Sequence, residues 1–575
     1  MARHEEGKHM SEDRNYWQKR LDTGRFTRRR FVGGTAVAGV GAASLALVGC
    51  GGDDSSNTTA NKTTASGGTA AAGQATATAT PKKGGVYTTA FTGPFAGADP
   101  HNSVYGGAGI VPQVYNYLFR DLTAIAPERG IIYDLAQSHQ LQPDNVTMVF
   151  KLRPDAKVAP NTQGIPERPL DSSDVLASWQ RIADPKVGSN AYFFTNNWID
   201  KMDAPDPQTF RMILKSPYAW TEATVGNNLY GAIVPKELLS SPDLKTKPVG
   251  GGPFKLSELV EGDHAKMDKN PNFWRQGYPY LDSEVIRAFA DQTTWLTAYT
   301  SGQVDYYAAT NQDEAKQVQA NVKDTAYFHE LGTGYLSFWM NTKSTPWTDP
   351  RVRQAVNLAT NRDEYIQLIG HGVGEPMGPL SPIFGKFVLT KEELAKAQPF
   401  NVADAKKLFD AAGIKEITFS HPTSSNVNDY VTIFVRQMQA AGVTAKPQPL
   451  DAGTWVAGYF TSKLTASLSL NQSYQHPDVP MQWYYTGGIT GNGHYDTGFS
   501  DPDVDTAIKK AAGTLDETQR VAAYKAAQNL ILSKSPPFIN FFGIYSDLLV
   551  APAIHGFQPK VGSLQYAYIQ EFWRS

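Results

Sequence analysis

The densest group of side chains able to bind a small polar molecule lies in the last third of the chain. It reads Asn471-Gln472-Ser473-Tyr474-Gln475-His476-Pro477 and is followed by Trp483-Tyr484-Tyr485-Thr486-Gly487-Gly488. Aromatic rings supply flat contact area, and amides and hydroxyls orient a polar molecule through hydrogen bonds. The pattern therefore favours a ligand pocket. For any single ring the alternative is core or hinge packing, because aromatic side chains are usually buried.

Sequence signatures of catalysis are missing. The chain has no Gly-x-Ser-x-Gly elbow, no Gly-x-x-x-x-Gly-Lys-Ser/Thr loop and no His-Glu-x-x-His helix. Its 11 histidines are scattered, and pairs such as His421 and His476 lack the spacing of a metal site. The run Gly250-Gly251-Gly252 lacks the strand-to-helix context of a nucleotide loop and indicates a tight turn. We expect no catalytic residue, no metal and no cofactor.

The overall composition is typical of a large globular protein, and 575 residues suggest three or four domains. The 53 basic side chains do not outnumber the 55 acidic ones. Nucleic acid is therefore an unfavourable partner, because there is no excess positive charge to follow a phosphate backbone. A single cysteine excludes an intrachain disulfide and a thiolate metal cluster.

The N-terminus is typical of an export signal. Residues 1–30 carry nine Lys/Arg, end in Thr27-Arg28-Arg29-Arg30 and precede an uncharged run from Phe31 to Gly49. Gly and Ala dominate this run, so it is too weakly apolar for a stable membrane span. The paired arginines before Phe31-Val32 resemble the twin-arginine signal, an address that a receptor reads. We expect residues 1–49 to direct export.

Cys50 ends the sequence Leu47-Val48-Gly49-Cys50, which resembles the bacterial lipobox, in which the cysteine is acylated and becomes the mature N-terminus. The alternative is a buried apolar cysteine. Loss of residues 1–49 leaves 44 basic against 50 acidic side chains, a net charge of about −6. Residues 51–83 are almost entirely small or polar and predict a flexible tether. Residues 50–83 are thus expected to form a lipid-attached linker.

Strand and helix patterns alternate in the remaining residues, 84–575. Residues 147–153 and 209–215 largely alternate polar with apolar side chains and predict half-buried strands. Between them, Asp171-Ser172-Ser173-Asp174 predicts a capped helix start. Asp349-Pro350 and Asp501-Pro502 predict two more helix starts, each with an acidic N-cap and proline at the first helical position.

The alternation is clearest in residues 345–540. Asn401 is predicted to cap a helix over 402–412, which Gly413 ends before a strand over 414–419. A helix over about 428–441 and a strand over 444–450 follow. Residues 538–544 predict a buried strand. This order favours α/β packing.

Eleven short motifs of the body match one known family in the correct order. They are Ala98-Asp99-Pro100-His101, residues 146–153, Asp174-Val175-Leu176-Ala177-Ser178-Trp179, Val234-Pro235-Lys236, residues 248–254, Asn270-Pro271-Asn272-Phe273-Trp274, Ser301-Gly302-Gln303-Val304-Asp305, Asn341-Thr342, Asp349-Pro350-Arg351-Val352-Arg353-Gln354-Ala355, Asp404-Ala405-Lys406-Lys407-Leu408 and Tyr485-Thr486-Gly487-Gly488. Each motif alone is weak, but together they cover essentially the whole body. The body resembles the family 5 solute-binding proteins of ABC transporters, the oligopeptide- and dipeptide-binding class.

The resemblance implies an α/β, two-lobed periplasmic-binding-protein-like fold of type II, cluster C, with an extra subdomain. Lobe one would comprise residues 84–125, 232–338 and 541–575, the extra subdomain residues 126–231, and lobe two residues 339–540. The chain would cross between the lobes near residues 338–341 and near Phe541. The lobes would close on a bound solute by hinge bending, and the loaded form would dock on a membrane permease.

One departure from the family pattern bears on the solute. Peptide-binding members hold the peptide's amino group with the aspartate of a Trp-x-x-Asp-Tyr segment, which here is Leu470-Asn471-Gln472-Ser473-Tyr474, with Ser473 at the acid's position. Residues 452–500 contain no arginine and only one lysine, Lys463, and a buried ligand charge needs an opposite charge. Asp478 is the alternative counter-charge. The pocket suits an uncharged polar solute such as an oligosaccharide, with a peptide as the equal alternative.

By matching positions the resemblance also implies which residues contact the solute. They are Tyr105, Tyr192, Asn311, Trp455, Asn471, Ser473, Tyr474 and Phe541. We therefore predict a lipoprotein, anchored through Cys50 on the outer face of the cytoplasmic membrane or in the periplasm, that binds an oligopeptide or other polar solute and delivers it to an ABC permease. The alternatives are an exported hydrolase of peptides or glycans and a chemosensory or chaperone-like binder.

Overall fold

The computed structural model describes most of the predicted folded body. The described residues are 80–93, 98–102, 107–121, 130–189, 191–226, 231–423, 425–472, 476–486, 496–557 and 569–575. The predicted export signal (1–49), Cys50 and nearly all of the predicted tether lie outside these ranges. Helices and strands alternate within them, which confirms the α/β prediction. None of the described helices has the length and apolar character needed to cross a membrane.

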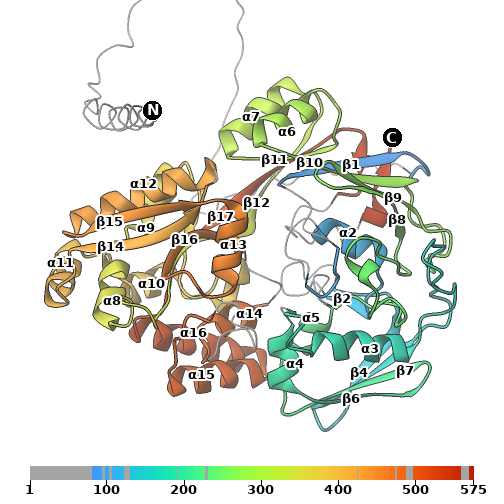
Figure 1. Ribbon diagram of the computed structural model, residues 1–575, viewed down its shortest axis with the longest axis horizontal. Helices are drawn as coiled ribbons and strands as arrows, with labels where there is room; N and C mark the ends of the chain where they lie inside the picture. The colour runs from blue at the N-terminus through green and yellow to red at the C-terminus, as the bar shows by residue number, and fades with distance from the viewer. Residues whose placement is uncertain are drawn as a thin grey trace, which may run out of the picture. The chain divides into compact units, whose positions relative to one another are not determined.

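A four-stranded sheet, which we call the first sheet, begins the body. Its strands lie in the order β1, β10, β9, β8. Their bounds are Val86–Thr92 (β1), Ser283–Phe289 (β10), His264–Lys269 (β9) and Phe254–Val260 (β8). β1 pairs in parallel with β10, so the start of the body lies beside a strand from the middle of the chain (Figure 1). Helices α2 (Gly107–Val114) and α6 (Gln292–Thr300) contact this sheet.

The second sheet lies wholly within residues 136–214. Its antiparallel strands lie in the order β4, β5, β7, β6. Their bounds are Ala136–Leu141 (β4), Thr147–Leu152 (β5), Thr209–Leu214 (β7) and Ile199–Asp206 (β6). β5 and β7 confirm the two strands predicted from polar–apolar alternation. The helices of this region are α3 (Ser172–Ile182), α4 (Tyr192–Trp198) and α5 (Thr221–Val225).

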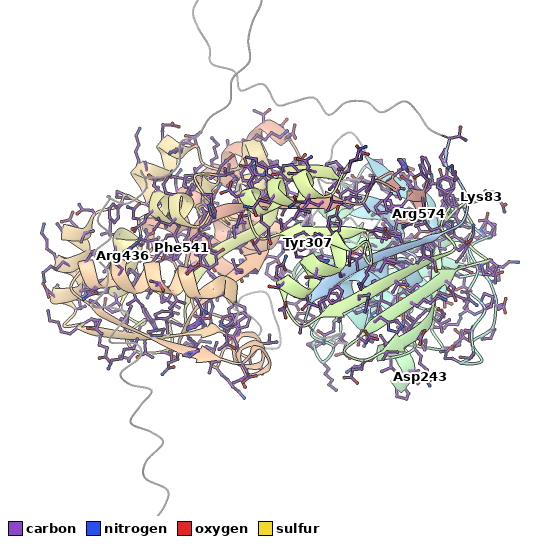
Figure 2. All side chains as sticks on the ribbon, turned by 90° about the horizontal axis from the view of Figure 1, so that it is seen from above. Lys83, Asp243, Tyr307, Arg436, Phe541 and Arg574 are labelled. Carbon is purple, nitrogen blue, oxygen red and sulfur yellow. The ribbon has the colours of Figure 1, made fainter. Side chains whose placement is uncertain are left out.

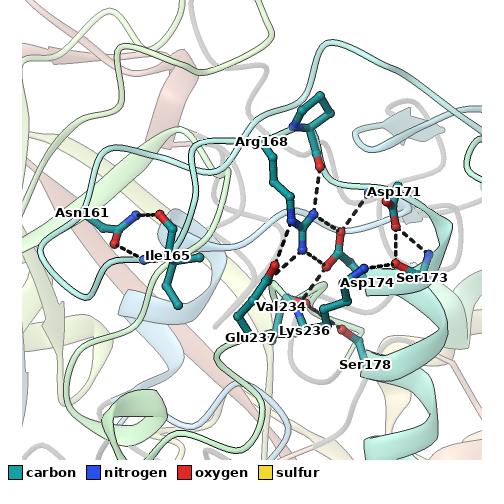
Figure 3. A network of polar contacts seen from close by, with 11 residues as sticks. Asn161, Ile165, Arg168, Asp171, Ser173, Asp174, Ser178, Val234, Lys236 and Glu237 are labelled. Atoms are coloured by element: carbon teal, nitrogen blue, oxygen red, sulfur yellow. Dashed lines mark hydrogen bonds and ion pairs between the residues drawn. The ribbon is translucent and has the colours of Figure 1, made fainter.

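The residues that cap α3 also bind a distant segment of the same chain, around Lys236 and Glu237 (Figure 3). Asp171 and Asp174 form a capping box at the start of the helix. The carboxylate of Asp174 accepts two hydrogen bonds from Arg168, at 2.8 and 2.7 Å, and one from the backbone N–H of Lys236 at 3.0 Å. Arg168 reaches the carboxylate of Glu237 as well, at 2.7 Å. The second sheet is thereby tied to the segment that leads back to the first sheet.

A seven-stranded sheet carries the C-terminal half of the body. Its main path is β11, β17, β12, β16, β14, β15, and β13 pairs with β17. The bounds are Tyr306–Ala309 (β11), Ala326–Met340 (β12), Glu375–Pro376 (β13), Glu416–Pro422 (β14), Thr444–Leu450 (β15), Ala466–Gln472 (β16) and Phe538–Val550 (β17). β14 is parallel to β15 and β16. Helices α12 (Ser425–Ala440) and α13 (Ala452–Phe460) supply the crossovers that parallel strands require.

The other described elements surround these sheets. The helices are α7 (Gln312–Asn321), α8 (Pro350–Ala359), α9 (Arg362–Leu368), α10 (Lys391–Ala397), α11 (Val402–Ala411), α14 (Asp478–Met481), α15 (Pro502–Gly513) and α16 (Glu517–Ser533), with 3-10 turns η2 (Pro242–Lys245), η3 (Pro382–Phe387) and η4 (Gln482–Tyr484). The short strands are β2 (Phe119–Asp121), β3 (Ile131–Tyr133), β18 (Ile554–His555) and β19 (Trp573–Arg574).

Most local predictions in this half are confirmed. Asp349, Asn401 and Asp501 are the N-caps of α8, α11 and α15, and each side chain accepts a backbone N–H of the first turn. α12 begins three residues earlier than predicted and β14 two residues later. β17 extends to Val550, well beyond the predicted end at residue 544, because its second part pairs with β11 and the start of β12.

β12 and β17 are the longest strands among the described residues. They pair with each other in the middle of the sheet, with β11 on the outer side of β17 and β16 on the outer side of β12 (Figure 1). Their pairing is irregular between Leu331 and Tyr335 and again between Tyr335 and Ser337. Gly332 lies in the first irregular stretch, where a Cβ atom would come within 2.4 Å of Ser546 Oγ. Irregular register of this kind locally disrupts the ladder and increases the twist of the strand pair.

The predicted tight turn at Gly250-Gly251-Gly252 is a bend fixed by packing. A Cβ atom on Gly250 would lie 2.4 Å from the carbonyl oxygen of Val114, and one on Gly252 would lie 2.4 Å from that of Gln113. None of the three glycines has a positive φ. Glycine is needed here because the backbone runs against the end of α2, a contact that no local pattern announces.

Candidate ligand-binding site

Two of the predicted contact residues, Trp455 and Asn471, lie in one buried polar network. Trp455, on α13, donates its indole N–H to Ser467 Oγ at 2.9 Å and stacks on Tyr459, with ring centroids 4.8 Å apart. The Tyr459 hydroxyl donates to Oδ1 of Asn471 at 3.0 Å. The structure thus brings the two residues together through Tyr459, which the sequence did not single out.

The amide of Asn471 is satisfied by protein groups. From β16, its Nδ2 donates to Ser337 Oγ on β12 at 2.5 Å and to Ser469 Oγ at 3.1 Å. Only 9% of Asn471 is exposed. A buried amide with its donors and acceptor paired is held in one orientation. Asn471 is therefore a fixed part of the sheet, two residues before Ser473 in the chain.

Asn311 and Tyr192 have local partners. Asn311 is the N-cap of α7, and its Oδ1 accepts the backbone N–H of Glu314 at 2.9 Å. Tyr192 is the first residue of α4 and is half-buried, and its hydroxyl donates to Asn196 Oδ1 at 3.4 Å. Both contacts lie within a helix or at its start, so they fix local structure whatever else the residues bind.

Phe541 lies in the apolar core of the seven-stranded sheet. Its side chain has no exposed surface, and its ring centroid is 4.6 Å from that of Tyr365 and 6.4 Å from that of Phe434. In Figure 2 Phe541 lies on the same side of the folded body as Arg436, and Asp243 lies on the other side. In this conformation Phe541 can support a site only through its neighbours.

The remaining predicted contact residues, Tyr105, Ser473 and Tyr474, lie outside the described residues, as does the predicted lipidation site Cys50. The prediction that these residues contact a solute or a lipid stays a prediction. Among the described residues, no group of three His, Cys, Asp or Glu side chains is arranged to hold a metal ion.

A second polar network joins the segment after the second sheet to the segments around α14 and α16. Tyr218 donates its hydroxyl to Asp478 Oδ2 at 2.8 Å, and Tyr524 donates to Asp478 Oδ1 at 3.3 Å. Gln482 donates to Oδ2 at 3.3 Å. Trp220 donates its indole N–H to the Tyr524 hydroxyl at 2.7 Å. The carboxylate of Asp478 is thus held by groups from three distant parts of the sequence.

Aromatic stacking extends this network. The rings of Trp220 and His476 are nearly parallel, at 9°, with centroids 5.4 Å apart. His476 Nε2 lies 3.0 Å from Thr224 Oγ1, and the guanidinium of Arg520 lies 5.1 Å from the Trp220 ring. We call Tyr218, Trp220, His476, Asp478 and Tyr524 the Asp478 cluster, all members of which are buried.

Burial sets the protonation of the cluster. It raises the pKa of Asp478 from 3.8 to about 6, and hydrogen bonds from Tyr218, Gln482 and Tyr524 oppose this rise. Burial lowers the pKa of His476 from 6.5 to about 3, so its ring is neutral at pH 7. Both oxygens of Asp478 already accept hydrogen bonds. In this conformation Asp478 is therefore not free to neutralise a ligand ammonium, the alternative that the sequence left open.

Sequence reasoning found only part of this cluster. His476 and Asp478 stand in the aromatic and amide-rich segment that the sequence singled out. Tyr218 and Trp220 lie in a short connection, Ser216-Pro217-Tyr218-Ala219-Trp220, where two large rings follow a strand. These two rings in a short connection after a strand are the one sequence feature that could have indicated the cluster. A further contact, the backbone N–H of Ala219 to the carbonyl of Ala512 at 2.8 Å, has no sequence signature.

Comparison with known sequences gives a family match. A model of the family described as bacterial extracellular solute-binding proteins, family 5 Middle, matches residues 130–492. The glutathione-binding protein GsiB of Escherichia coli (strain K12) is 24% identical over 444 residues, which cover 73% of this chain and 82% of that protein. GsiB of Shigella dysenteriae serotype 1 gives the same identity and coverage.

Solved structures resemble the fold. The DppA protein of Helicobacter pylori in complex with peptide STSA has a TM-score of 0.76 at 20% identity, covering 86% of this chain and 98% of that one. OppA of Haemophilus influenzae, in complex with RPPGFSPFR, has a TM-score of 0.73 at 18% identity, covering 86% and 99%. The likeness confirms the predicted fold class, a two-lobed periplasmic-binding-protein-like α/β fold.

Proposed function

We propose, on the premise that this chain belongs to the family 5 bacterial extracellular solute-binding proteins, that it captures a polar solute and delivers it to an ABC permease. The observation that carries the proposal is the family match over residues 130–492. This range runs from β3 to η4 and includes the whole second sheet. Proteins of this family bind substrates for importers and are not enzymes. The comparisons give no support to an exported hydrolase, and we propose that this chain has no catalytic activity.

The proposed location is outside the cytoplasm, which is where the family acts. A lipid on Cys50 is proposed to hold the protein to the membrane, in the periplasm or on the outer face of the cytoplasmic membrane. Its support is the arginine-rich segment before Phe31 and the sequence Leu47-Val48-Gly49-Cys50. The tether over residues 51–83 would leave the folded body free to meet both solute and permease.

The proposed solute is a short peptide or a peptide-like molecule. GsiB is a glutathione-binding protein, and the Helicobacter pylori structure holds a tetrapeptide, so relatives of this fold accept such ligands. An oligosaccharide is the second candidate. One observation favours it: residues 452–500 offer no arginine and one lysine, and the Asp478 carboxylate is already occupied.

The proposed contacts are the residues predicted from the family resemblance. They are Tyr105, Tyr192, Asn311, Trp455, Asn471, Ser473 and Tyr474, and the eighth predicted residue, Phe541, is proposed to support them from the core. The proposal is supported by the network that joins Trp455 to Asn471 at the end of β16, because it fixes the chain just before Ser473. Fixed polar groups that orient a ligand are typical of binding pockets.

The proposal is tested by binding and by turnover. Native mass spectrometry of the purified chain should detect a co-purified solute, and calorimetry with tripeptides, tetrapeptides and neutral oligosaccharides should identify the class that binds. Small-angle scattering should detect compaction when that class is added. Chromatography of the recovered ligand should find it intact. Turnover of the ligand, or no binding and no compaction with either class, would overturn the proposal.

A further inference from the structure

A cavity of about 330 Å³ lies beside the seven-stranded sheet, near β13. It is enclosed by the start of α9, by α10, and by the chain before α11 and at β13. Its lining residues are Thr360, Asn361, Arg362, Asp363, Pro376, Lys391, Leu394, Ala395, Gln398, Pro399 and Phe400. This volume is at the lower end of the range of small-molecule sites. No predicted solute-contact residue lines it.

Arg362 is a buried cation in the wall of this cavity. Only 7% of the residue is exposed, and burial lowers the pKa of its guanidinium to about 10. Nε donates to the backbone carbonyl of Asn540 at 2.9 Å, and Nη2 donates to Asn357 Oδ1 at 2.8 Å. Among the described residues Nη1 has no hydrogen-bond partner, and no carboxylate forms an ion pair with the guanidinium. A guanidinium has five N–H donors, so this lining residue has donors that no described residue uses.

A second cation faces the same space. Lys391 is the first residue of α10 and lines the cavity. Its ammonium makes no ion pair with any residue in the described ranges, although the neighbouring Glu393 pairs with Lys525 at 3.0 Å. A buried guanidinium and a partly hydrated ammonium are the two groups that proteins use to bind carboxylate and phosphate.

The cavity has one opposing charge and an apolar wall. Asp363 is the single carboxylate of the lining, so the lining carries one net positive charge. Pro376, Leu394 and Phe400 supply apolar surface, and Phe400 is 51% exposed, unusual for so large an apolar side chain. A ligand that matches both features carries one negative charge on a compact apolar body.

We propose that this cavity binds a small carboxylate with an apolar or aromatic body, its carboxylate held by Arg362 and Lys391 and its body against Leu394 and Phe400. The Arg362 fork suits the two oxygens of a carboxylate. Burial of the apolar body against Phe400 adds affinity that inorganic anions lack. The proposal does not rest on the proposed transport function, since the residues involved are separate from the predicted solute contacts.

The test uses the full chain and three probes: benzoate, its neutral isostere benzamide, and inorganic phosphate. Ligand-observed NMR and calorimetry at constant ionic strength should detect binding of benzoate, with benzamide and phosphate each binding at least about tenfold more weakly, since a tenfold change corresponds to one lost charge contact or one buried ring face. Equal binding of benzoate and benzamide, or no binding of benzoate, would overturn the proposal.

Three variants with different expected effects test whether benzoate binds in this cavity. Lys391→Gln should weaken benzoate binding about fivefold, the effect of removing a partly exposed ion pair. Asp363→Asn should strengthen it by a similar factor, because the opposing carboxylate is gone. Lys396→Gln, on the exposed part of the same helix α10 but outside the lining, should leave it unchanged. Identical effects of Lys391→Gln and Lys396→Gln, or weaker binding in Asp363→Asn, would overturn the proposal even if every variant folds normally.

Discussion

The hydroxyl of Tyr218 donates to Oδ2 of Asp478 at 2.8 Å across 260 positions of the chain. Tyr524 donates to the other oxygen, and only 1% of Asp478 is exposed. Among the described residues no cation forms an ion pair with this carboxylate. Two hydroxyls and one amide therefore take the place of water and of a cation around this carboxylate. The affinity of Asp478 for a proton depends on the hydrogen bond from Tyr218 being formed.

Replacement of Asp478 by Asn should change how stability depends on pH. The pKa of Asp478 is raised to about 6 in the folded chain, so the folded chain binds the proton more tightly than the unfolded one. Its contribution to stability is full below pH 3.8 and is lost as the pH rises through about 6. Urea unfolding should find that wild type gains about 2–3 kcal/mol relative to Asp478→Asn between pH 7 and pH 4.

Two comparisons control this experiment. His476 has a pKa lowered to about 3, so its contribution is present above pH 6.5 and is lost as the pH falls, but it is common to both proteins and cancels in the difference. Asp144→Asn should give a difference of the opposite sign, because hydrogen bonds from Thr147 lower the pKa of Asp144. A pH-independent difference between wild type and Asp478→Asn would contradict the account of the cluster.

Tyr218→Phe should weaken both the fold and solute binding. It removes the shortest hydrogen bond to the buried Asp478 carboxylate, at a cost of about 1–3 kcal/mol. Tyr218 belongs to the predicted extra subdomain and Asp478 to predicted lobe two, so loss of their hydrogen bond should also weaken a solute that binds when these two parts close. Tyr133→Phe is the matched control, because the one partner of its hydroxyl in the described part of the chain is His139, six residues away, at 3.0 Å. Equal losses of solute affinity in both variants would refute a role for the contact in closure.

Local signals in the sequence predicted the elements of the fold well. Asp349, Asn401 and Asp501 lie at helix starts because an N-cap needs only its own first turn. The strands at 147–153 and 209–215 were found because alternation reports burial of one face. The end of β17 was missed, since its length is decided by pairing with β11 and β12, which lie far away in sequence.

The site was only partly predictable for the same reason. The segment around His476 attracted attention through its composition, but its partner Trp220 could not be found, because stacking between them depends on the whole fold. Trp455 and Asn471 were named by family resemblance, which does not report that their polar atoms are already paired within the sheet. Phe541 was named in the same way and lies in the core.

Asn471→Ala should separate the structural role of this residue from its proposed contact with solute. The substitution leaves the hydroxyls of Tyr459 and Ser337 without their amide partner and should cost about 1–3 kcal/mol in urea unfolding. In a cycle with Ser337→Ala, the coupling free energy should be about 0.5–3 kcal/mol. Calorimetry should also find weaker solute binding. Loss of stability with unchanged affinity would leave Asn471 as a purely structural residue.

Cys50→Ser should release the protein from the membrane. The substitution removes the one thiol that a lipid could modify in this chain. Fractionation of cells should find the wild type with the membranes and the variant in the soluble extracytoplasmic fraction, and labelling with a clickable fatty acid should mark only the wild type. Solute affinity of the purified variant should be unchanged, because 35 residues separate Cys50 from the start of β1 at Val86 in the sequence. Membrane association of Cys50→Ser at the wild-type level would count against the lipid anchor.

Gly332→Ala should destabilise the β12–β17 ribbon where its register shifts. An alanine Cβ at this position would lie 2.4 Å from Ser546 Oγ and 2.9 Å from the carbonyl oxygen of Ile544. The serine side chain can rotate away, but the backbone carbonyl cannot, so β17 must move. We expect a loss of about 1–3 kcal/mol in urea unfolding, typical of overpacking. Gly334→Ala is the matched control two residues away, since its Cβ would meet nothing closer than 4.0 Å. Similar losses for both variants would mean that β12 is sensitive to any side chain at these glycines, and would contradict the assignment of the loss to the close approach of β17 at Gly332.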